Sequence, residues 1–177
     1  MQPTKPMTRA NKSVTVTLMI MRHGDAQSHT GSVADAQRPL SAQGCSEVTT
    51  TACWLKEYLL QRSQPQVRWL ITSPYRRAQE TADIIAAHLP PQHLETSTDI
   101  IPQGNLDVFI DWLFAKLEQQ QWVDGTVVIV SHMPFVSHLV ATLDPQTPPL
   151  IFPTAGMAEL ELDITYQRAR FLRMIVT

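Results

Sequence analysis

The sequence has 177 residues, 44% of them hydrophobic, and a formal net charge of −2. A chain of this length is usual for one domain and is long enough to bury a single hydrophobic core. The nearly balanced charge and the scattered aromatic residues argue against a nucleic-acid-binding surface, and no apolar run has the length of a membrane span, so we expect neither nucleic acid nor membrane as a partner.

The first residues differ in composition from the rest of the chain. Residues 1–13 are polar, contain two prolines and lack an apolar core of signal-peptide length, so we expect a flexible leader before a single domain over residues 14–177. Cys45 and Cys53 lie eight residues apart in a predicted helix, which is too far for a disulfide. We therefore expect reduced, structural cysteines and a cytoplasmic location.

Strand and helix patterns alternate along the chain. The apolar, β-branched run at 14–21 predicts a buried strand, and residues 25–39 are polar and contain breakers, which predicts a loop. Ser41 is a good N-cap for a helix that runs to about residue 62. The elements that follow are a strand at 67–72, a helix at 75–89, a short extended piece at 94–98, a helix at 106–119, a strand at 126–130, a helix at 135–143, and two final strands, in a hairpin, at 157–163 and 171–176. This alternation predicts an α/β fold, a three-layer α/β/α sandwich with a mainly parallel central sheet.

Polar residues follow the ends of three predicted strands. Arg22 and His23 end the first strand, Arg76 and Arg77 follow the second, and His132 follows the strand at 126–130. If these strands are parallel, all three ends open on the same edge of the sheet, where ligands bind. Arginine side chains offer forked donors to phosphate oxygens, and a neutral imidazole is a competent nucleophile toward phosphorus. The combination indicates a phosphoryl-transfer site.

Four blocks, in the same order, make the sequence similar to the histidine phosphatase superfamily. The blocks are Leu18-Met-Ile-Met-Arg-His-Gly-Asp-Ala26, Arg38-Pro-Leu-Ser-Ala-Gln-Gly44, Ser73-Pro-Tyr-Arg-Arg-Ala-Gln-Glu-Thr81 and Val128-Ile-Val-Ser-His132. The short chain and the Arg-His-Gly-Asp-Ala form of the first block, with Thr147-Pro-Pro149 late in the chain, resemble the SixA-type phosphohistidine phosphatases. The resemblance implies the histidine-phosphatase fold, which is phosphoglycerate-mutase-like.

The resemblance also implies the roles of the site residues. His23 would be the catalytic nucleophile that carries the phosphoryl group, and Arg22, Arg77 and His132 would bind the phosphoryl oxygens and stabilise the transition state. We prefer Arg77 to Arg76 because the arginine of the family block immediately precedes an alanine.

Two neighbours of the nucleophile are candidate pocket residues. Gly24 would keep the turn small, so that its backbone could lie close to a bound anion. Asp25 would either have a role at the site, shaping the pocket or orienting a neighbour, or cap the loop, and the two interpretations are equally supported.

A general acid is the part of the family's machinery that the sequence does not supply. Larger members use a carboxylate to protonate an alcohol leaving group, and here the corresponding region, 94–104, offers only Glu95 and Asp99, neither of them convincing. A phosphohistidine needs less help, since its imidazole departs neutral if the ring is already protonated.

We therefore predict a phosphohistidine phosphatase that acts through phospho-His23 on a partner protein, either a histidine phosphotransfer domain or a phosphocarrier. Alternatives are a small-molecule phosphomonoesterase of the same superfamily, a non-catalytic phosphate-binding module and, least supported, a mutase. We expect a monomer that has no cofactor. We also expect no metal, because the arginines would repel a cation.

Overall fold

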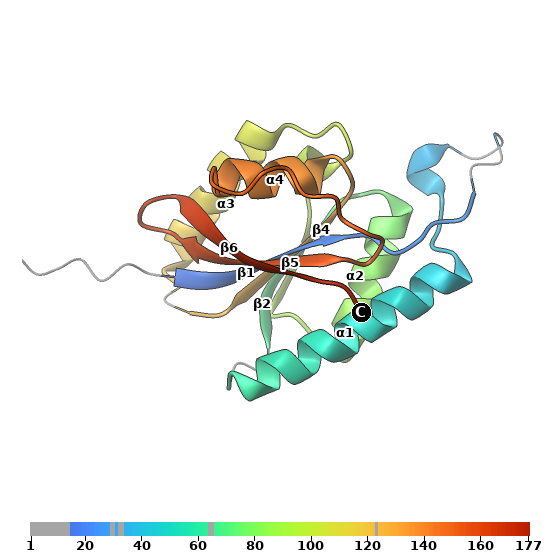
Figure 1. The fold of residues 1–177 in the computed structure, drawn as a ribbon, viewed down its shortest axis with the longest axis horizontal. Helices are drawn as coiled ribbons and strands as arrows, with labels where there is room; N and C mark the ends of the chain where they lie inside the picture. The colour runs from blue at the N-terminus through green and yellow to red at the C-terminus, as the bar shows by residue number, and fades with distance from the viewer. Residues whose placement is uncertain (1–14, 29–30, 32–33, 64–65, 123) are drawn as a thin grey trace, which may run out of the picture.

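The computed structural model describes residues 15–28, 31, 34–63, 66–122 and 124–177 (Figure 1). The predicted leader over residues 1–13 lies outside the described residues. In chain order the elements are β1 (Thr15–Arg22), the 3-10 turn η1 (Asp35–Gln37), α1 (Ala42–Gln61), β2 (Val67–Thr72), α2 (Arg76–His88), β3 (His93–Thr96), the 3-10 turn η2 (Thr98–Ile100), α3 (Leu106–Gln120), β4 (Thr126–Ser131), α4 (Phe135–Leu143), β5 (Met157–Asp163) and β6 (Arg168–Ile175). None of the helices within these ranges combines the length and the apolar character that crossing a membrane requires.

A six-stranded mixed sheet forms the middle layer, with the strand order β3-β2-β4-β1-β5-β6. The first four strands in this order are parallel to one another, while β5 runs antiparallel to β1 and pairs with β6 in a hairpin. The parallel part places the carboxyl ends of β1, β2 and β4 at one edge of the sheet. The predicted mainly parallel sheet is confirmed, and so is the final hairpin.

Helices cover both faces of the sheet, which gives the three layers that the sequence predicts. Along β1, Leu18 and Ile20 join one buried cluster while Met19 and Met21 join another on the opposite face. This alternation follows from the period of two in a strand and explains why residues 18–21 of β1, which are buried on both faces, form an uninterrupted apolar run.

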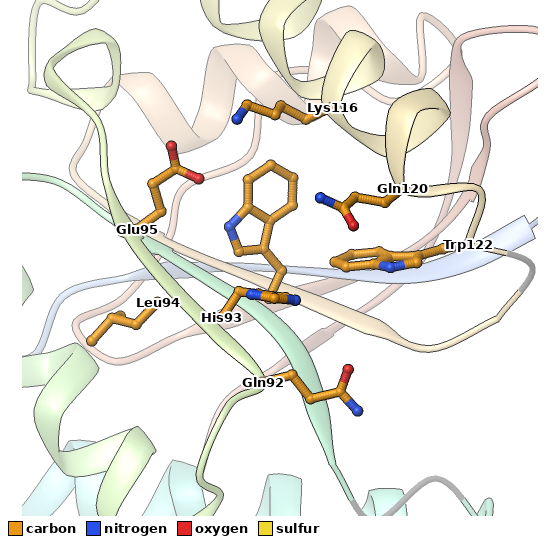
Figure 2. A pocket seen from close by; sticks show the side chains of 8 residues that line it. Gln92, His93, Leu94, Glu95, Lys116, Gln120 and Trp122 are labelled. Atoms are coloured by element: carbon orange, nitrogen blue, oxygen red, sulfur yellow. The ribbon is translucent and has the colours of Figure 1, made fainter.

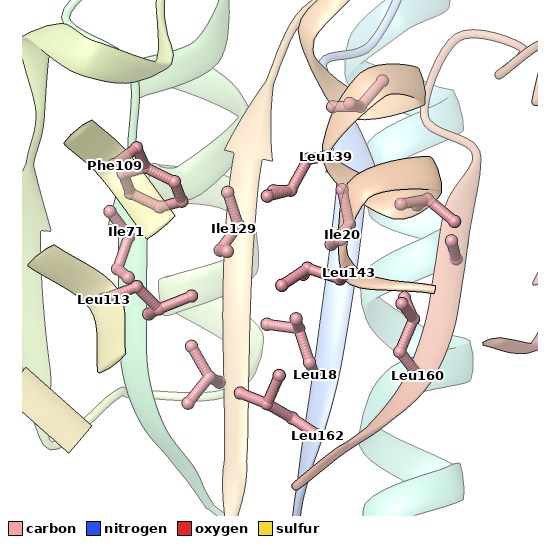
Figure 3. Packing of buried hydrophobic residues seen from close by; sticks show 14 of the residues in the cluster. Leu18, Ile20, Ile71, Phe109, Leu113, Ile129, Leu139, Leu143, Leu160 and Leu162 are labelled. Carbon is pink, nitrogen blue, oxygen red and sulfur yellow. The ribbon is translucent and has the colours of Figure 1, made fainter. Parts of the chain in front are cut away.

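The upper face in Figure 1 is covered by α3 and α4, and the lower face by α1 together with α2. Figure 3 shows Phe109 and Leu113 of α3 beside Ile71 of β2, and Leu139 and Leu143 of α4 beside β1. Burial of these side chains is the main term that fixes the helices to the sheet.

Both cysteines are free and exposed on α1, so the expectation that they are structural is wrong. The face of α1 that packs on the sheet is made by aliphatic residues at helical spacing, and Cys45 and Cys53 lie outside it. These aliphatic residues are Val48, Ala52, Leu55 and Leu59.

The predicted loop over 25–39 contains two short ordered pieces. Ala26 forms an isolated antiparallel bridge with Leu40, and Asp35–Gln37 forms η1. Polar composition and breaker residues do not predict these pieces, because contacts with distant side chains stabilise them.

The open edge at β6 is basic. Its Arg168, Arg170 and Arg173 lie opposite Asp163, Glu161 and Glu159 of β5 in the hairpin register. Arg170 forms an ion pair of 2.9 Å with Glu161, and Arg173 one of 2.7 Å with the buried Glu159.

Candidate active site

The register between β1 and β4 brings the two histidines of the sequence motifs together. Arg22 lies opposite Ser131 at the ends of these parallel strands, and the His23 amide donates to the Ser131 carbonyl at 3.0 Å. His23 and His132 are the next residues, and their ring centroids lie 4.9 Å apart. Both residues are buried, His23 with 7% and His132 with 1% of its surface exposed.

Hydrogen bonds to both ring nitrogens orient His23. Nδ1 lies 2.7 Å from the Gly24 carbonyl oxygen, an acceptor, so Nδ1 carries the ring proton and donates it. Nε2 is then the unprotonated nitrogen, and it accepts a hydrogen bond of 3.1 Å from Arg77 Nε. The nitrogen able to attack an electrophile therefore faces the guanidinium group.

Burial keeps the His23 ring neutral at physiological pH. The pKa of His23 is lowered to about 4, chiefly by desolvation and also by the positive charges of Arg77, Arg22 and Arg38, against the opposing effect of the Gly24 hydrogen bond. A neutral imidazole surrounded by cations is suited to attack an anionic phosphoryl group, because its lone pair is available while its surroundings attract the electrophile.

His132 is fixed by a hydroxyl and an aromatic ring. Its Nε2 lies 2.7 Å from the Ser73 hydroxyl oxygen, and the Tyr75 ring packs edge-on against it at 5.0 Å. Desolvation, followed by the charges of His23, Arg77 and Arg22, lowers the pKa of His132 well below its ordinary value. Ser73 and Tyr75 are site residues that the sequence reasoning missed, although they lie inside its third block.

Two buried nitrogen atoms at this site have no hydrogen-bond partner among the described residues. They are Arg22 Nε and His132 Nδ1, while Arg22 Nη1 donates to the Phe152 carbonyl at 2.7 Å. A buried polar atom without a partner costs about 1–3 kcal/mol. The oxygens of a tetrahedral anion are acceptors that would satisfy such atoms.

The two consecutive arginines of α2 have different surroundings. Arg77 has only 4% of its surface exposed and its guanidinium group lies over the Tyr75 ring, 4.9 Å from the centroid. Arg76 is exposed and pairs with Glu80 at 2.8 Å, one helical turn away. The choice of Arg77 over Arg76 as the residue beside His23 agrees with this geometry.

A carboxylate that the sequence reasoning did not single out contacts the site. Asp35 of η1 accepts hydrogen bonds from Arg77 through its backbone oxygen at 2.7 Å and its Oδ2 at 3.1 Å, and from Arg38 through its Oδ1 at 2.9 Å. Arg38 belongs to the second sequence block, so its position in a family block could have marked it as a site residue. Asp35 lies in an irregular polar segment, where no sequence pattern marks it.

Gly24 and Asp25 contact the start of α1. A side-chain carbon at Gly24 would lie 2.7 Å from the Gly44 oxygen, so the close approach that requires a glycine here is to α1. The approach of the Gly24 backbone to a bound anion stays a prediction. The Asp25 carboxylate accepts from the Ser41 hydroxyl at 2.5 Å, and its amide donates to Glu47 at 3.1 Å. Of the two interpretations of Asp25, these contacts favour the one in which it anchors the loop.

A separate pocket of about 400 Å³ lies at the β3 edge of the sheet (Figure 2). Glu95, one of the two weak acid candidates, lines it together with His93, Trp122 and Lys116, so its carboxylate belongs to this pocket. Within the part of the chain that the structure describes, no group of three or more His, Cys, Asp or Glu side chains could hold a metal ion.

The chain is similar in sequence to known proteins. Residues 18–101 match the histidine phosphatase superfamily (branch 1). The chain is 32% identical over 147 residues to the phosphohistidine phosphatase SixA of Escherichia coli K12, covering 82% of this chain and 85% of that protein. It is 33% identical over 149 residues to the SixA homolog of Haemophilus influenzae, covering 82% and 88%.

The fold agrees as well. A solved structure of the protein histidine phosphatase SixA complexed with tungstate superposes with a TM-score of 0.78 at 29% identity, covering 90% of this chain and 96% of that one. Sequence identity of this extent over most of both chains, together with the shared fold, shows that the chain belongs to the histidine phosphatase superfamily, in its SixA-type branch.

Proposed function

We propose that the chain is a phosphohistidine phosphatase that hydrolyses phosphohistidine on a partner protein, a histidine phosphotransfer domain or a phosphocarrier, through a phospho-His23 intermediate. We place it in the cytoplasm as a monomer without cofactor or metal. Its catalytic group comprises His23 as nucleophile, with Arg22, Arg77 and His132 as the ligands of the phosphoryl oxygens.

The observation that carries the proposal is the buried, neutral His23 ring, whose Nε2 accepts from Arg77. Its neighbours include two nitrogens, on Arg22 and His132, that have no hydrogen-bond partner in the described part of the chain. An entering phosphoryl group would accept the hydrogen bond that Arg77 Nε now gives to His23. Its oxygens would also accept from Arg22 Nε and, in the tautomer that carries the proton on Nδ1, from His132. Because tungstate is a tetrahedral oxyanion like phosphate, the tungstate complex of a similar protein also supports an anion site of this kind.

The first chemical step transfers the phosphoryl group to His23. Nε2 attacks phosphorus, the bond between phosphorus and the substrate's ring nitrogen breaks, and the electron pair of that bond stays with the departing nitrogen. If the substrate's other ring nitrogen carries a proton, its imidazole departs neutral. The Nδ1 proton of His23 remains on its hydrogen bond to Gly24.

The second step releases phosphate. A water oxygen attacks the phosphorus of phospho-His23, the bond to Nε2 breaks, and its electron pair returns to the His23 ring. One water proton goes to a phosphate oxygen or to solvent. His23 regains its starting form with the proton on Nδ1, so the cycle needs no alcohol-protonating acid.

Acid-labile labelling tests the nucleophile. On mixing with a ³²P-phosphohistidine protein, the wild type is expected to acquire label that is lost in acid and kept in alkali. The His23→Ala variant is expected to acquire none and to lose turnover by about a thousandfold or more, the scale seen when a nucleophile is removed.

His138→Ala is the matched control, because His138 is an exposed histidine on α4, and it should label like the wild type. A His23→Ala protein that still hydrolyses the substrate would remove the nucleophile assignment. Faster turnover of sugar or nucleotide monophosphates than of the phosphohistidine protein would instead favour a small-molecule phosphomonoesterase.

A further inference from the structure

The Asp35 carboxylate joins two arginines at the site. Its Oδ2 lies 3.1 Å from Arg77 Nη2 and its Oδ1 lies 2.9 Å from Arg38 Nε. Its backbone oxygen accepts from Arg77 Nη1 at 2.7 Å. Arg77 thus uses one N–H on His23 and two on Asp35, and a negative side chain is bonded to the guanidinium group that contacts the nucleophile.

Burial indicates on which side of the site this carboxylate lies. Arg77 has 4% of its side-chain surface exposed, whereas Asp35 has 51% exposed and no residue of η1 is buried. Asp35 therefore lies between the buried guanidinium group and solvent, on the exposed side of Arg77. Figure 1 shows the segment that carries η1, in light blue, beyond the end of β1.

The carboxylate is ionised under ordinary conditions. Partial burial raises the pKa of Asp35, but the hydrogen bonds and charges of Arg77 and Arg38 outweigh this effect and lower the pKa below its usual value. Asp35 therefore adds a fixed negative charge beside a group of positive charges whose function is to attract an anion.

A negative charge in this position acts differently on different phosphoryl compounds. At neutral pH inorganic phosphate is a mixture of monoanion and dianion, and phosphate monoesters are close to dianionic with leaving groups that carry no positive charge, so the carboxylate repels both. A phosphohistidine with a protonated ring carries a positive charge one ring away from phosphorus, and the carboxylate attracts it. The same attraction favours the protonated ring, which is the form that departs as neutral imidazole.

We propose that Asp35 is a specificity-determining residue, which selects phosphoryl donors with a cationic leaving group, such as phosphohistidine, over inorganic phosphate and phosphate monoesters. This inference rests on the proposed function. It states that one carboxylate determines the preference for phosphohistidine over the monoester substrates of other phosphatases. The same carboxylate would assist product release, because it opposes rebinding of inorganic phosphate.

The test compares Asp35→Asn with the wild type in two measurements. Isothermal titration with inorganic phosphate should show about fivefold tighter binding to the variant, the size expected for removing one partly exposed charge contact. The ratio of kcat/KM on a phosphohistidine protein to kcat/KM on p-nitrophenyl phosphate should fall about fivefold or more. Asp35→Ser, a smaller neutral replacement, should change both quantities in the same direction.

Asp111→Asn is the matched control, because it removes the same charge from an exposed position on α3, and it should change neither quantity. Unchanged or weaker phosphate binding in Asp35→Asn would overturn the proposal, since the carboxylate would then only position Arg77. Tighter phosphate binding with an unchanged ratio of the two kcat/KM values would also overturn it, because the carboxylate would then weaken the binding of all phosphoryl compounds equally.

The titration does not depend on the substrate assigned to the enzyme. If the wild type fails to hydrolyse a phosphohistidine protein, the proposed function fails, and the titration still decides whether Asp35 opposes anion binding. If the wild type hydrolyses the phosphohistidine protein and the ratio of the two kcat/KM values is the same in Asp35→Asn, only the proposed role of Asp35 is wrong.

Discussion

Arg76 and Arg77 are consecutive residues at the start of α2, yet only Arg77 is buried against His23. Its Nε and both terminal nitrogens each make a hydrogen bond in a fixed plane, which a lysine ammonium cannot reproduce. We expect Arg77→Lys to lower kcat by about a hundredfold, the scale for losing a donor to a developing oxyanion, although the charge is retained. Steady-state kinetics on a phosphohistidine protein measure this.

Arg76→Lys is the matched control for this substitution. Arg76 is exposed and its partner Glu80 can pair with a lysine equally well, so kcat should stay within about twofold. Equal losses in the two variants would show that the pair acts through total charge, and the geometric argument for Arg77 would be wrong.

At the scale of the element, the start of α1 positions the loop that follows His23. The Ser41 hydroxyl oxygen caps α1 by accepting from the Gly44 amide at 3.0 Å, and the same hydroxyl donates to Asp25 at 2.5 Å. We expect Ser41→Ala to lower the free energy of unfolding by about 1–2 kcal/mol, since it removes a cap and a charge-assisted hydrogen bond. It should also raise KM, because the Asp25 loop loses its anchor. Urea unfolding and steady-state kinetics measure the two effects.

Asn105 caps α3 in the same manner, by accepting from the Val108 amide at 3.2 Å, without a contact to the loop after His23 among the described hydrogen bonds. Asn105→Ala should therefore lower stability by about 1 kcal/mol and leave KM unchanged. A rise in KM of the same size in both variants would disprove the link between the α1 cap and the site.

Elements whose signal is local were predicted well from the sequence. The apolar face of α1 and the uninterrupted apolar runs of β1 and β4 predict their own conformation, and the structure confirms each within a few residues. Strand ends then predicted where His23 and His132 would lie, because parallel strands bring their carboxyl ends to one edge.

Contacts that depend on tertiary structure were not predicted. Asp35 acquires its role only when α2 brings Arg77 over η1, and Ser73 only when β2 lies beside β4, so no pattern in their own segments marks them. The same reason explains Gly24, whose neighbour is α1, a helix that begins well after it in the chain.

At the scale of the whole molecule, the buried histidines make stability depend on pH. The pKa of His23 is lowered to about 4 and that of His132 is also lowered, so the unfolded chain binds protons near pH 6.5 while the folded chain does not. Stability rises with pH wherever the unfolded state holds more protons, so it must fall as pH drops from about 6.5 toward 4. We expect the urea midpoint of the wild type to fall over this range, and that of His132→Gln to fall less.

His138→Gln serves as the reference, because His138 is exposed on α4 and its replacement should leave the full acid-dependent loss in place. An identical loss in wild type and His132→Gln would mean that other groups control the acid transition.

The arginines of β6 have a consequence for how molecules meet each other. An unpaired strand at the edge of a sheet offers its backbone groups to any strand that approaches, and proteins commonly block such edges with charge. Here the cross-strand acids of β5 balance Arg168, Arg170 and Arg173 within one molecule. A second copy that aligned its own β6 along this edge would bring arginine beside arginine with no acid left between them. Arg170 and Arg173 therefore stabilise the hairpin through their ion pairs, and together with Arg168 they oppose edge-to-edge aggregation.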